Sequence, residues 1–247
     1  MNDDNSILTK NFQKYFTVKF ATTQEQKSSA YGVRYRVYCD EFGYEPIDRY
    51  PDKEEIDDYD AFSLHCLIVH KKSDLPAGCV RLVPAFDNNN QEVLLPLESH
   101  CHESLDHPFI DSLNLDRHTV CEISRLAVDR LFRRRSGEEV TRFGEIEGMD
   151  VSKQEQRTFS LIAVAAFLAA TAMTDISGKT NVFAMMEPFL PRLMKRSGII
   201  FHKAGFDTDY RGIRAPYFIQ TQSALDNMRA DLKELYRWIY QQISETK

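Results

Sequence analysis

The hydrophobic and polar positions along the chain predict a sheet of several strands. Six segments combine strand-like length with alternating, β-branched or aromatic apolar residues. They lie at 16–22, 62–71, 78–84, 119–129, 180–186 and 215–222. The turn sequence SDLPAG separates the second segment from the third, which predicts an antiparallel hairpin.

Four further segments have helical periodicity or residues typical of helix boundaries. They lie at about 24–43, 154–174, 187–198 and 224–243. Thr22 or Thr23 can cap the first helix, and Gly43 can end it. Because no helix separates the strands between residues 62 and 129, we expect a mixed, mainly antiparallel sheet with helices on both faces. The predicted fold class is therefore α+β, an α/β/α sandwich with an extra C-terminal helix.

The remaining segments are typical of loops. Residues 46–60 are acidic and contain two prolines, residues 85–118 are irregular, and residues 136–153 are charged and glycine-containing, as in a mobile loop. We expect one domain over 1–222 and a helical extension over 223–247 that packs on the same domain.

Composition narrows the class of protein. A hydrophobic content of 43% in 247 residues provides a substantial core, and a net charge of −6 disfavours a nucleic-acid partner. The five cysteines form no C-x-x-C pair, which favours reduced thiols in the cytoplasm. The acidic N-terminus is unlike a secretory signal, and the longest apolar run, 161–173, has about 13 residues where a transmembrane helix needs roughly 20. A transmembrane segment is therefore not expected.

Charged residues inside or beside predicted buried segments are the main functional signal. They are Arg34 of the first helix, Asp57, Asp58 and Asp60 of the acidic loop, Arg81 of the third strand, and Glu122 and Arg125 of the fourth. A charge buried in a strand costs folding free energy unless it is paired. We expect these groups to form one alternating cluster at a site, the alternative being separate solvated positions.

Glu122 and Arg125 are three residues apart, so strict alternation would place them on opposite faces of the sheet. A β-bulge between them would give them a common face. We predict such a bulge, which also frees backbone N–H groups that can polarise a carbonyl oxygen.

The motifs around these charges resemble a known family. AYGVRYRVYCDEFGYEP (30–46), EEIDDYD (54–60), AGCVRLVP (77–84) and CEISRLAVD (121–129) together look like the acyl-homoserine-lactone synthases and N-acyl amino acid synthases, which share the GNAT acyltransferase fold. The run FRRRSG and the loop behind it look most like the PEP-CTERM/exosortase-associated acyltransferases. The resemblance implies transfer of a long-chain fatty acyl group from an acyl carrier protein thioester to an amine, in the bacterial cytoplasm.

The resemblance, carried over residue by residue, implies two sets of site residues. The candidate catalytic residues are Arg34, Asp57, Glu122 and Arg125. The candidate substrate-binding residues are Tyr38, Tyr44, Asp60 and Arg81. Glu122 is the candidate general base for aminolysis of the thioester, or a structural partner of the arginines. Tyr38 and Tyr44 replace the Phe and Trp that are usual in the lactone synthases, which favours an amino acid or related amine as the acceptor.

Basic residues are candidates for binding the acyl donor. Arg133, Arg134 and Arg135 follow the fourth strand, near where GNAT proteins place a pyrophosphate-binding loop. Arginine forks suit the phosphate of a carrier protein's phosphopantetheine, and Lys195 and Arg196 extend the candidate patch. The alternatives are a solvated turn and favourable charges at a helix C-terminus.

The acyl chain requires an apolar channel, which we expect between the helix 159–173 and the strand 180–186. Phe167 and Phe183 are its candidate lining residues, although the same pattern fits an ordinary core. Cys121 is more typical of a core residue than of a nucleophile. His100, Cys101, His102 and His107 do not have the spacing of a standard zinc site, so no metal is expected.

The sequence thus predicts an N-acyltransferase without a permanently bound cofactor. Acyl-ACP or acyl-CoA is the expected co-substrate, an acyl carrier protein the expected partner, and a homodimer and peripheral membrane association are further options. Two alternatives stay open: an acyl-homoserine-lactone synthase that uses S-adenosylmethionine, and a non-catalytic acyl-binding protein on the same fold.

Overall fold

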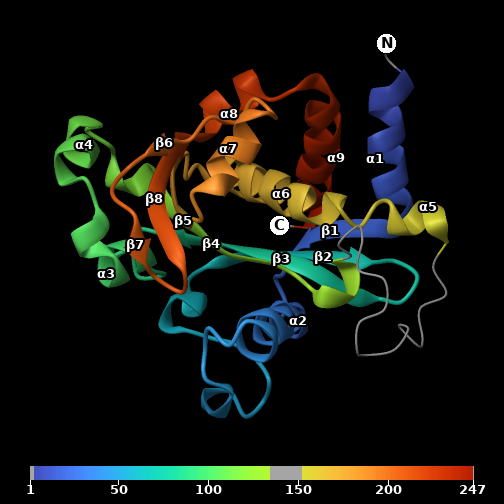
Figure 1. The fold of residues 1–247 in the computed structure, drawn as a ribbon, viewed down its shortest axis with the longest axis horizontal. Helices are drawn as coiled ribbons and strands as arrows, with labels where there is room; N and C mark the ends of the chain where they lie inside the picture. Colours follow the sequence, from blue (N-terminus) through green and yellow to red (C-terminus); the bar gives the residue numbers. More distant parts are fainter. Residues whose placement is uncertain (1–2, 134–151, 247) are drawn as a thin grey trace.

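A mixed sheet runs through the middle of the molecule (Figure 1). The computed structural model describes residues 3–133 and 152–246. The strands are β1 (Phe16–Phe20), β2 (Leu64–His70), β3 (Leu75–Pro84), β4 (Val120–Val128), β5 (Asn181–Met186), β6 (His202–Lys203), β7 (Thr208–Asp209) and β8 (Ile213–Gln220). Their order is β1-β2-β3-β4-β5-β8-β6, with β7 beside β8. Every pairing is antiparallel except β4 with β5.

Helices cover both faces of this sheet. They are α1 (Asp3–Tyr15), α2 (Gln24–Tyr35), α3 (Pro96–His100), α4 (His107–Ser112), α5 (Lys153–Gln156), α6 (Leu161–Ser177), α7 (Phe189–Lys195), α8 (Thr221–Asn227) and α9 (Ala230–Thr246). Figure 1 shows α2 on one face and α1, α6, α7 and α9 on the other. The α+β sandwich with a mainly antiparallel sheet is therefore confirmed.

Three local features differ from the expected elements. The polar N-terminal segment forms α1, which packs through Phe12 against the rings of Phe16 and Trp238. The first predicted helix changes at Arg36 into a π-helical turn, Arg36–Glu41. The C-terminal helix is broken between α8 and α9, because Arg229 N–H donates to the Ser197 carbonyl and so ties the chain to the end of α7.

The C-terminal helix α9 packs against α6, α1 and β1 on the face away from α2. Its buried side chains are Leu232, Leu235, Tyr236, Ile239 and Ile243, and the Tyr236 hydroxyl donates to Asp175 of α6 at 3.0 Å. The division of the chain at residue 222 stays a prediction. Within residues 3–133 and 152–246, we find no helix that is both long and apolar enough to cross a bilayer.

Replacement of Leu235 by Ala is expected to lower the free energy of unfolding by about 2–5 kcal/mol, because the fully buried side chain leaves a cavity between α9 and α6. The exposed Gln241 of the same helix provides the control, and Gln241→Ala should change stability by no more than about 0.5 kcal/mol. Urea unfolding of both variants checks this, and equal effects would show that α9 is not part of the core.

Candidate active site

Three arginines and three carboxylates form a network on the face of the sheet that α2 covers, and all are buried except the half-buried Asp57 and Arg125. The arginines are Arg34 of α2, Arg81 of β3 and Arg125 of β4, and the carboxylates are Glu55, Asp57 and Asp60 of the segment between α2 and β2. Arg34 donates to Glu55 at 2.5 Å and to Asp60 at 2.7 and 2.9 Å. Arg81 donates to Asp57 at 2.5 Å and to Asp60 at 2.8 Å. Arg125 donates to both Glu55 and Asp57 at 3.0 Å. Five of the seven expected residues therefore lie together with Glu55, and the formal charges of the network cancel.

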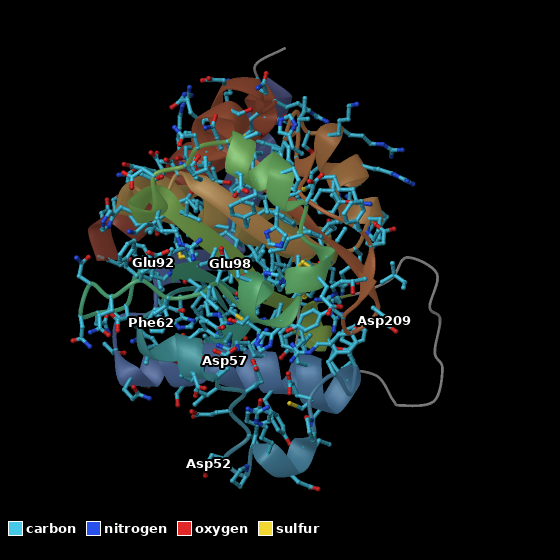
Figure 2. The ribbon with its side chains drawn as sticks, turned by 90° about the vertical axis from the view of Figure 1, so that its left-hand side faces the viewer. Asp52, Asp57, Phe62, Glu92, Glu98 and Asp209 are labelled. Atoms are coloured by element: carbon cyan, nitrogen blue, oxygen red, sulfur yellow. The ribbon has the colours of Figure 1, made fainter. Side chains whose placement is uncertain are left out.

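The acidic segment is shaped by its own side chains. The Asp57 side chain accepts from Tyr59 N–H at 3.0 Å, and Asp60 accepts from Asp57 N–H at 2.8 Å, which closes a short 3-10 turn. This reciprocal capping fixes Asp57 and Asp60 on one side of the turn. Figure 2 shows Asp57 where α2 meets the sheet, whereas Asp52 of the same segment lies away from it. Asp58, also in the expected cluster, is exposed.

The predicted bulge lies at Arg125 itself. Ser124 pairs with Arg81 and Ala127 pairs with Cys79, so Arg125 and Leu126 together oppose the single residue Val80. Arg125 adopts a φ of +51°, a left-handed conformation that is rare for a residue with a side chain. The ion pairs to Glu55 and Asp57 compensate this strain, and the bulge places the guanidinium with the other network residues.

The network fixes the protonation states of its members. Burial by itself would raise the pKa of Asp60, but hydrogen bonds and charge from Arg34 outweigh burial and hold the pKa well below its usual range. Burial likewise opposes ionisation of Glu55, yet the charges of Arg34 and Arg125 lower its pKa. Arg34 stays protonated because Glu55 and Asp60 raise its pKa against the effect of burial. Arg34, Glu55 and Asp60 are thus ionised near neutral pH.

Glu122 lies beside this network but outside its ion pairs. One carboxylate oxygen accepts from Leu97 N–H at 2.7 Å, and the side chain is buried. Burial raises the pKa of Glu122 to about 7, against smaller lowering effects of the Leu97 N–H, Arg81 and Arg125. A carboxyl group with this pKa can accept and return a proton near neutral pH.

A polar inner pocket opens where β4 and β5 separate. The parallel pairing of these strands ends at Glu122 and Phe183, although β4 continues to Val128. The inner pocket holds about 450 Å³ of space between atoms, and its lining includes Tyr38, Glu122, Ser124, Arg125, Tyr210, Arg211 and Arg214. It shares Arg125, Tyr210 and Arg211 with a larger outer pocket of about 860 Å³, to which Asp57 contributes.

An apolar pocket lies on the other face of the sheet, between α6, β5 and the segment after α7. It holds about 480 Å³ of space, part of it open to solvent, and its lining includes Phe167, Ala170, Ala184, Met194 and Phe201. Ile123, the residue after Glu122, lines both this pocket and the inner pocket. The expected apolar space between helix and sheet is therefore adjacent to the polar site.

The two aromatic residues expected to line one channel lie on opposite faces of the sheet. Phe167 lines the apolar pocket, as expected. Phe183 instead packs with Leu97, Val120 and Phe218 in a separate core cluster. The physical reason is strand alternation, since Val182 and Ala184 face α6 and Phe183 between them must face away. The assignment of Phe183 to the channel is thus wrong for this structure.

Tyr38 and Tyr44 both lie close to the inner pocket. The Tyr38 hydroxyl donates to the Leu126 carbonyl at 2.9 Å, and the Arg125 guanidinium lies 5.6 Å from the centre of the Tyr38 ring. The Tyr44 ring lies 6.3 Å from that of Tyr38 and 5.6 Å from the Arg214 guanidinium. The tyrosines therefore hold cations at the rim of the pocket.

The basic residues expected to bind the acyl donor do not form one patch. Arg133 pairs with Glu41 and lies over the Phe42 ring, next to the turn that follows α2. Lys195 and Arg196 are exposed at the end of α7, on the opposite side of the sheet (Figure 1). Arg134 and Arg135 lie outside the described residues. The expected continuity of Arg133 with Lys195 and Arg196 is therefore wrong, because the sheet separates them.

Four site residues were not expected from the sequence. They are Glu55, Tyr210, Arg211 and Arg214. Glu55 precedes the D-x-x-D motif in an acidic run, where nothing in the pattern distinguishes it from its exposed neighbours. The other three belong to the β7–β8 hairpin, whose approach to β4 depends on tertiary packing. The one indication in the sequence is that charged residues come directly before the apolar strand segment 215–222.

The cysteines and histidines were considered in the sequence as a possible nucleophile and as possible metal ligands. Burial raises the pKa of the Cys121 thiol well above its usual range, which opposes a thiolate nucleophile. Within the part of the chain that the structure describes, no group of three or more His, Cys, Asp or Glu residues is arranged to hold a metal ion.

Residues 33–142 match the family model of the acetyltransferase (GNAT) domain. The matched range includes all six residues of the network and Glu122. No curated protein matches the sequence. The domain match supports an N-acyltransferase.

Solved structures share the fold over most of the chain. TofI, in a ternary complex with an inhibitor and MTA, is 18% identical, with a TM-score of 0.58 over 89% of this chain and 99% of that one. BjaI, a CoA-dependent acyl-homoserine lactone synthase with SAM and isopentyl-CoA, is 15% identical, with a TM-score of 0.56 over 91% and 89%. FeeM, an N-acyl amino acid synthase from uncultured soil microbes, is 9% identical, with a TM-score of 0.53 over 89% and 97%. These likenesses confirm the GNAT-like fold.

Replacement of Glu55 by Gln is expected to lower the free energy of unfolding by about 3–5 kcal/mol, because Arg34 and Arg125 lose the charge that compensates their burial. The matched change Asp58→Asn in the exposed neighbour should have an effect within about 0.5 kcal/mol. Denaturant unfolding at pH 7 measures both, and a similar small loss in the two variants would contradict the bridging role of Glu55.

Proposed function

We propose that the chain transfers a long-chain fatty acyl group from an acyl carrier protein thioester to the amine of an amino acid or related small molecule. The observation that carries this proposal is the position of Glu122. Its carboxyl group, with a pKa near 7, lines the polar inner pocket at the point where Ile123 also lines the apolar pocket. An amine acceptor and an acyl chain can therefore meet beside one proton acceptor.

The reaction is direct aminolysis. The amine must lose a proton before it attacks, since an ammonium group has no lone pair. The Glu122 carboxylate accepts this proton, the amine nitrogen forms a bond to the thioester carbonyl carbon, and the carbon–sulfur bond breaks. The departing thiolate takes up the second proton, which the nitrogen loses as the amide forms. No covalent enzyme intermediate is required.

The thioester carbonyl is proposed to lie against β4 beyond Glu122. The paired ladder of β4 with β5 ends there, so β4 N–H groups directed toward β5 are available to a substrate oxygen. Donors fixed in this way stabilise the negative charge that develops on the carbonyl oxygen. In this proposal Arg34, Asp57 and Arg125 act with Glu55, Asp60 and Arg81 to hold β4, while Tyr38 and Tyr44 bound the acceptor site.

The donor is proposed to be acyl-ACP, with acyl-CoA as the alternative. An acidic carrier surface complements the exposed Lys195 and Arg196 beside the apolar pocket, whereas BjaI is described as CoA-dependent. The closeness to exosortase-associated acyltransferases, the cytoplasmic location, the homodimer and peripheral membrane association stay predictions.

A homoserine-lactone synthase that uses S-adenosylmethionine is the second candidate. It is favoured by the shared fold of BjaI, whose structure contains SAM and isopentyl-CoA. Incubation of the enzyme with acyl-ACP and S-adenosylmethionine separates the candidates. Release of methylthioadenosine with a homoserine-lactone product would support the second candidate, and an N-acyl amino acid formed from a free amino acid supports the first.

Replacement of Glu122 by Gln is expected to lower kcat by about 10²–10⁴-fold, because the amine loses its proton acceptor. For the wild type, kcat/KM should rise with pH and level off above about pH 7, as the Glu122 carboxyl group ionises. The variant should lack this rise while still binding a long-chain acyl ligand. The exposed Glu103 supplies the control variant, Glu103→Gln, which should keep both properties.

Thioester consumption, followed by thiol release, and calorimetry of acyl binding measure these effects. Normal turnover by the Glu122→Gln variant would rule out Glu122 as the base. An absence of turnover by the wild type with every amine, together with acyl binding, would favour the non-catalytic acyl-binding protein.

Replacement of Ala170 by Leu is expected to lower kcat/KM for the longest acyl donors by about 10-fold or more, because the added carbons occupy the apolar pocket. Donors with short chains should be affected less. Ala163 lies on the exposed side of the same helix, so Ala163→Leu is the matched control and should leave the chain-length profile unchanged. A parallel loss for all chain lengths would exclude this pocket as the acyl site.

A further inference from the structure

Arg214 is a cation of the inner pocket that forms no ion pair with the residues that the structure describes. The charges of the six-residue network cancel within it, and Arg211 pairs with Glu45. Arg214 has no ion pair with any described residue, and its buried Nε–H lacks a hydrogen-bond acceptor. A buried donor without an acceptor costs folding free energy, and the cost is larger on a charged group. A ligand that accepts from the Arg214 Nε–H would remove this cost.

The position of Arg214 is fixed by its surroundings. It lies at the start of β8, opposite Thr208 of β7, and its guanidinium lies 5.6 Å from the centre of the Tyr44 ring. Cation–π contact orients a guanidinium without using its N–H donors. Burial and the nearby charge of Arg214 lower the pKa of Arg211, as expected where two cations are close together.

We infer that Arg214 binds the carboxylate of the amine acceptor, so that the acceptor is an amino acid or another aminocarboxylate. This inference rests on the proposed function. Arg214 and Glu122 line the same pocket, so a small molecule with adjacent amine and carboxylate groups can present its amine to Glu122 and its carboxylate to Arg214. A planar guanidinium suits a carboxylate because two N–H groups can donate to its two oxygens.

The free Nε–H contributes to selectivity as well as affinity. An acceptor without a carboxylate would leave the Arg214 charge and its Nε–H unsatisfied inside the pocket. Sites built to satisfy a polar group discriminate strongly against analogues that lack the partner. The arginine therefore selects aminocarboxylates over simple amines.

The test compares acceptors that differ only in the carboxylate. The wild type is assayed with acyl-ACP and each proteinogenic amino acid, and the best of these is compared with its decarboxylated amine and its carboxamide. S-adenosylmethionine and its decarboxylated form make up a further pair. Arg214→Gln removes the charge, Arg214→Lys keeps the charge without the planar fork, and Arg237→Gln on the exposed side of α9 is the matched control.

The expected result is a preference of the wild type for the aminocarboxylate of at least 10-fold in kcat/KM. Arg214→Gln should lose about 10- to 100-fold with the aminocarboxylate, chiefly through KM, and little with the decarboxylated amine. The kcat/KM of Arg214→Lys with the aminocarboxylate should lie between those of the wild type and Arg214→Gln. Arg237→Gln should have the kcat/KM of the wild type. Equal use of both acceptors by the wild type, or an equal loss with both in Arg214→Gln, would overturn the inference.

A binding measurement separates this inference from the proposed function. Calorimetry with the amino acid and its carboxamide, after the melting temperatures confirm folded variants, requires no turnover. Binding of the amino acid by the wild type but not by Arg214→Gln supports the carboxylate site even if no acyl transfer occurs. Indistinguishable binding of the amino acid and its carboxamide by the wild type refutes the site even if acyl transfer is observed.

Discussion

The paired contact of Glu55 with Arg34 and Arg125 is the interaction on which the rest of the site depends. Glu55 is fully buried and, through Arg34 and Arg125, joins α2 to the bulged strand β4. Without that carboxylate, two guanidinium groups would be buried against each other, and the left-handed conformation of Arg125 would lose its compensation. The bulge in turn sets which groups of β4 face the inner pocket.

Charge balance inside the network explains why Glu122 differs from its neighbours. Each of the three network carboxylates contacts two arginines. The charges of these arginines lower the pKa values of Glu55 and Asp60. Among the residues that the structure describes, the Leu97 N–H donates the one hydrogen bond to Glu122, and burial has the largest effect on its pKa. The same cluster of charges thus yields fixed anions for structure and one carboxyl group that titrates near neutral pH.

The separation of β4 from β5 creates the space beside Glu122 in which the two pockets lie. Two strands that run parallel and then diverge leave backbone groups and space between them, with the polar pocket on one face and the apolar pocket on the other. The β7–β8 hairpin adds Tyr210, Arg211 and Arg214 to the polar side. In the proposed function, the acyl chain occupies the apolar side of this division and the acceptor the hairpin side.

The sequence by itself indicated the layers, the positions of most strands along the chain and the gathering of Arg34, Asp57, Asp60, Arg81 and Arg125. It did so because apolar periodicity reports burial, and a buried charge must find a partner. Asp58 and Glu122, which were also expected in the cluster, lie outside its ion pairs. Only the tertiary structure decided that Glu55 bridges the cluster, that Phe183 faces away from the apolar pocket, and that Arg214 reaches the site. These outcomes depend on strand register and on a distant hairpin, and neither leaves a local pattern in the residues concerned.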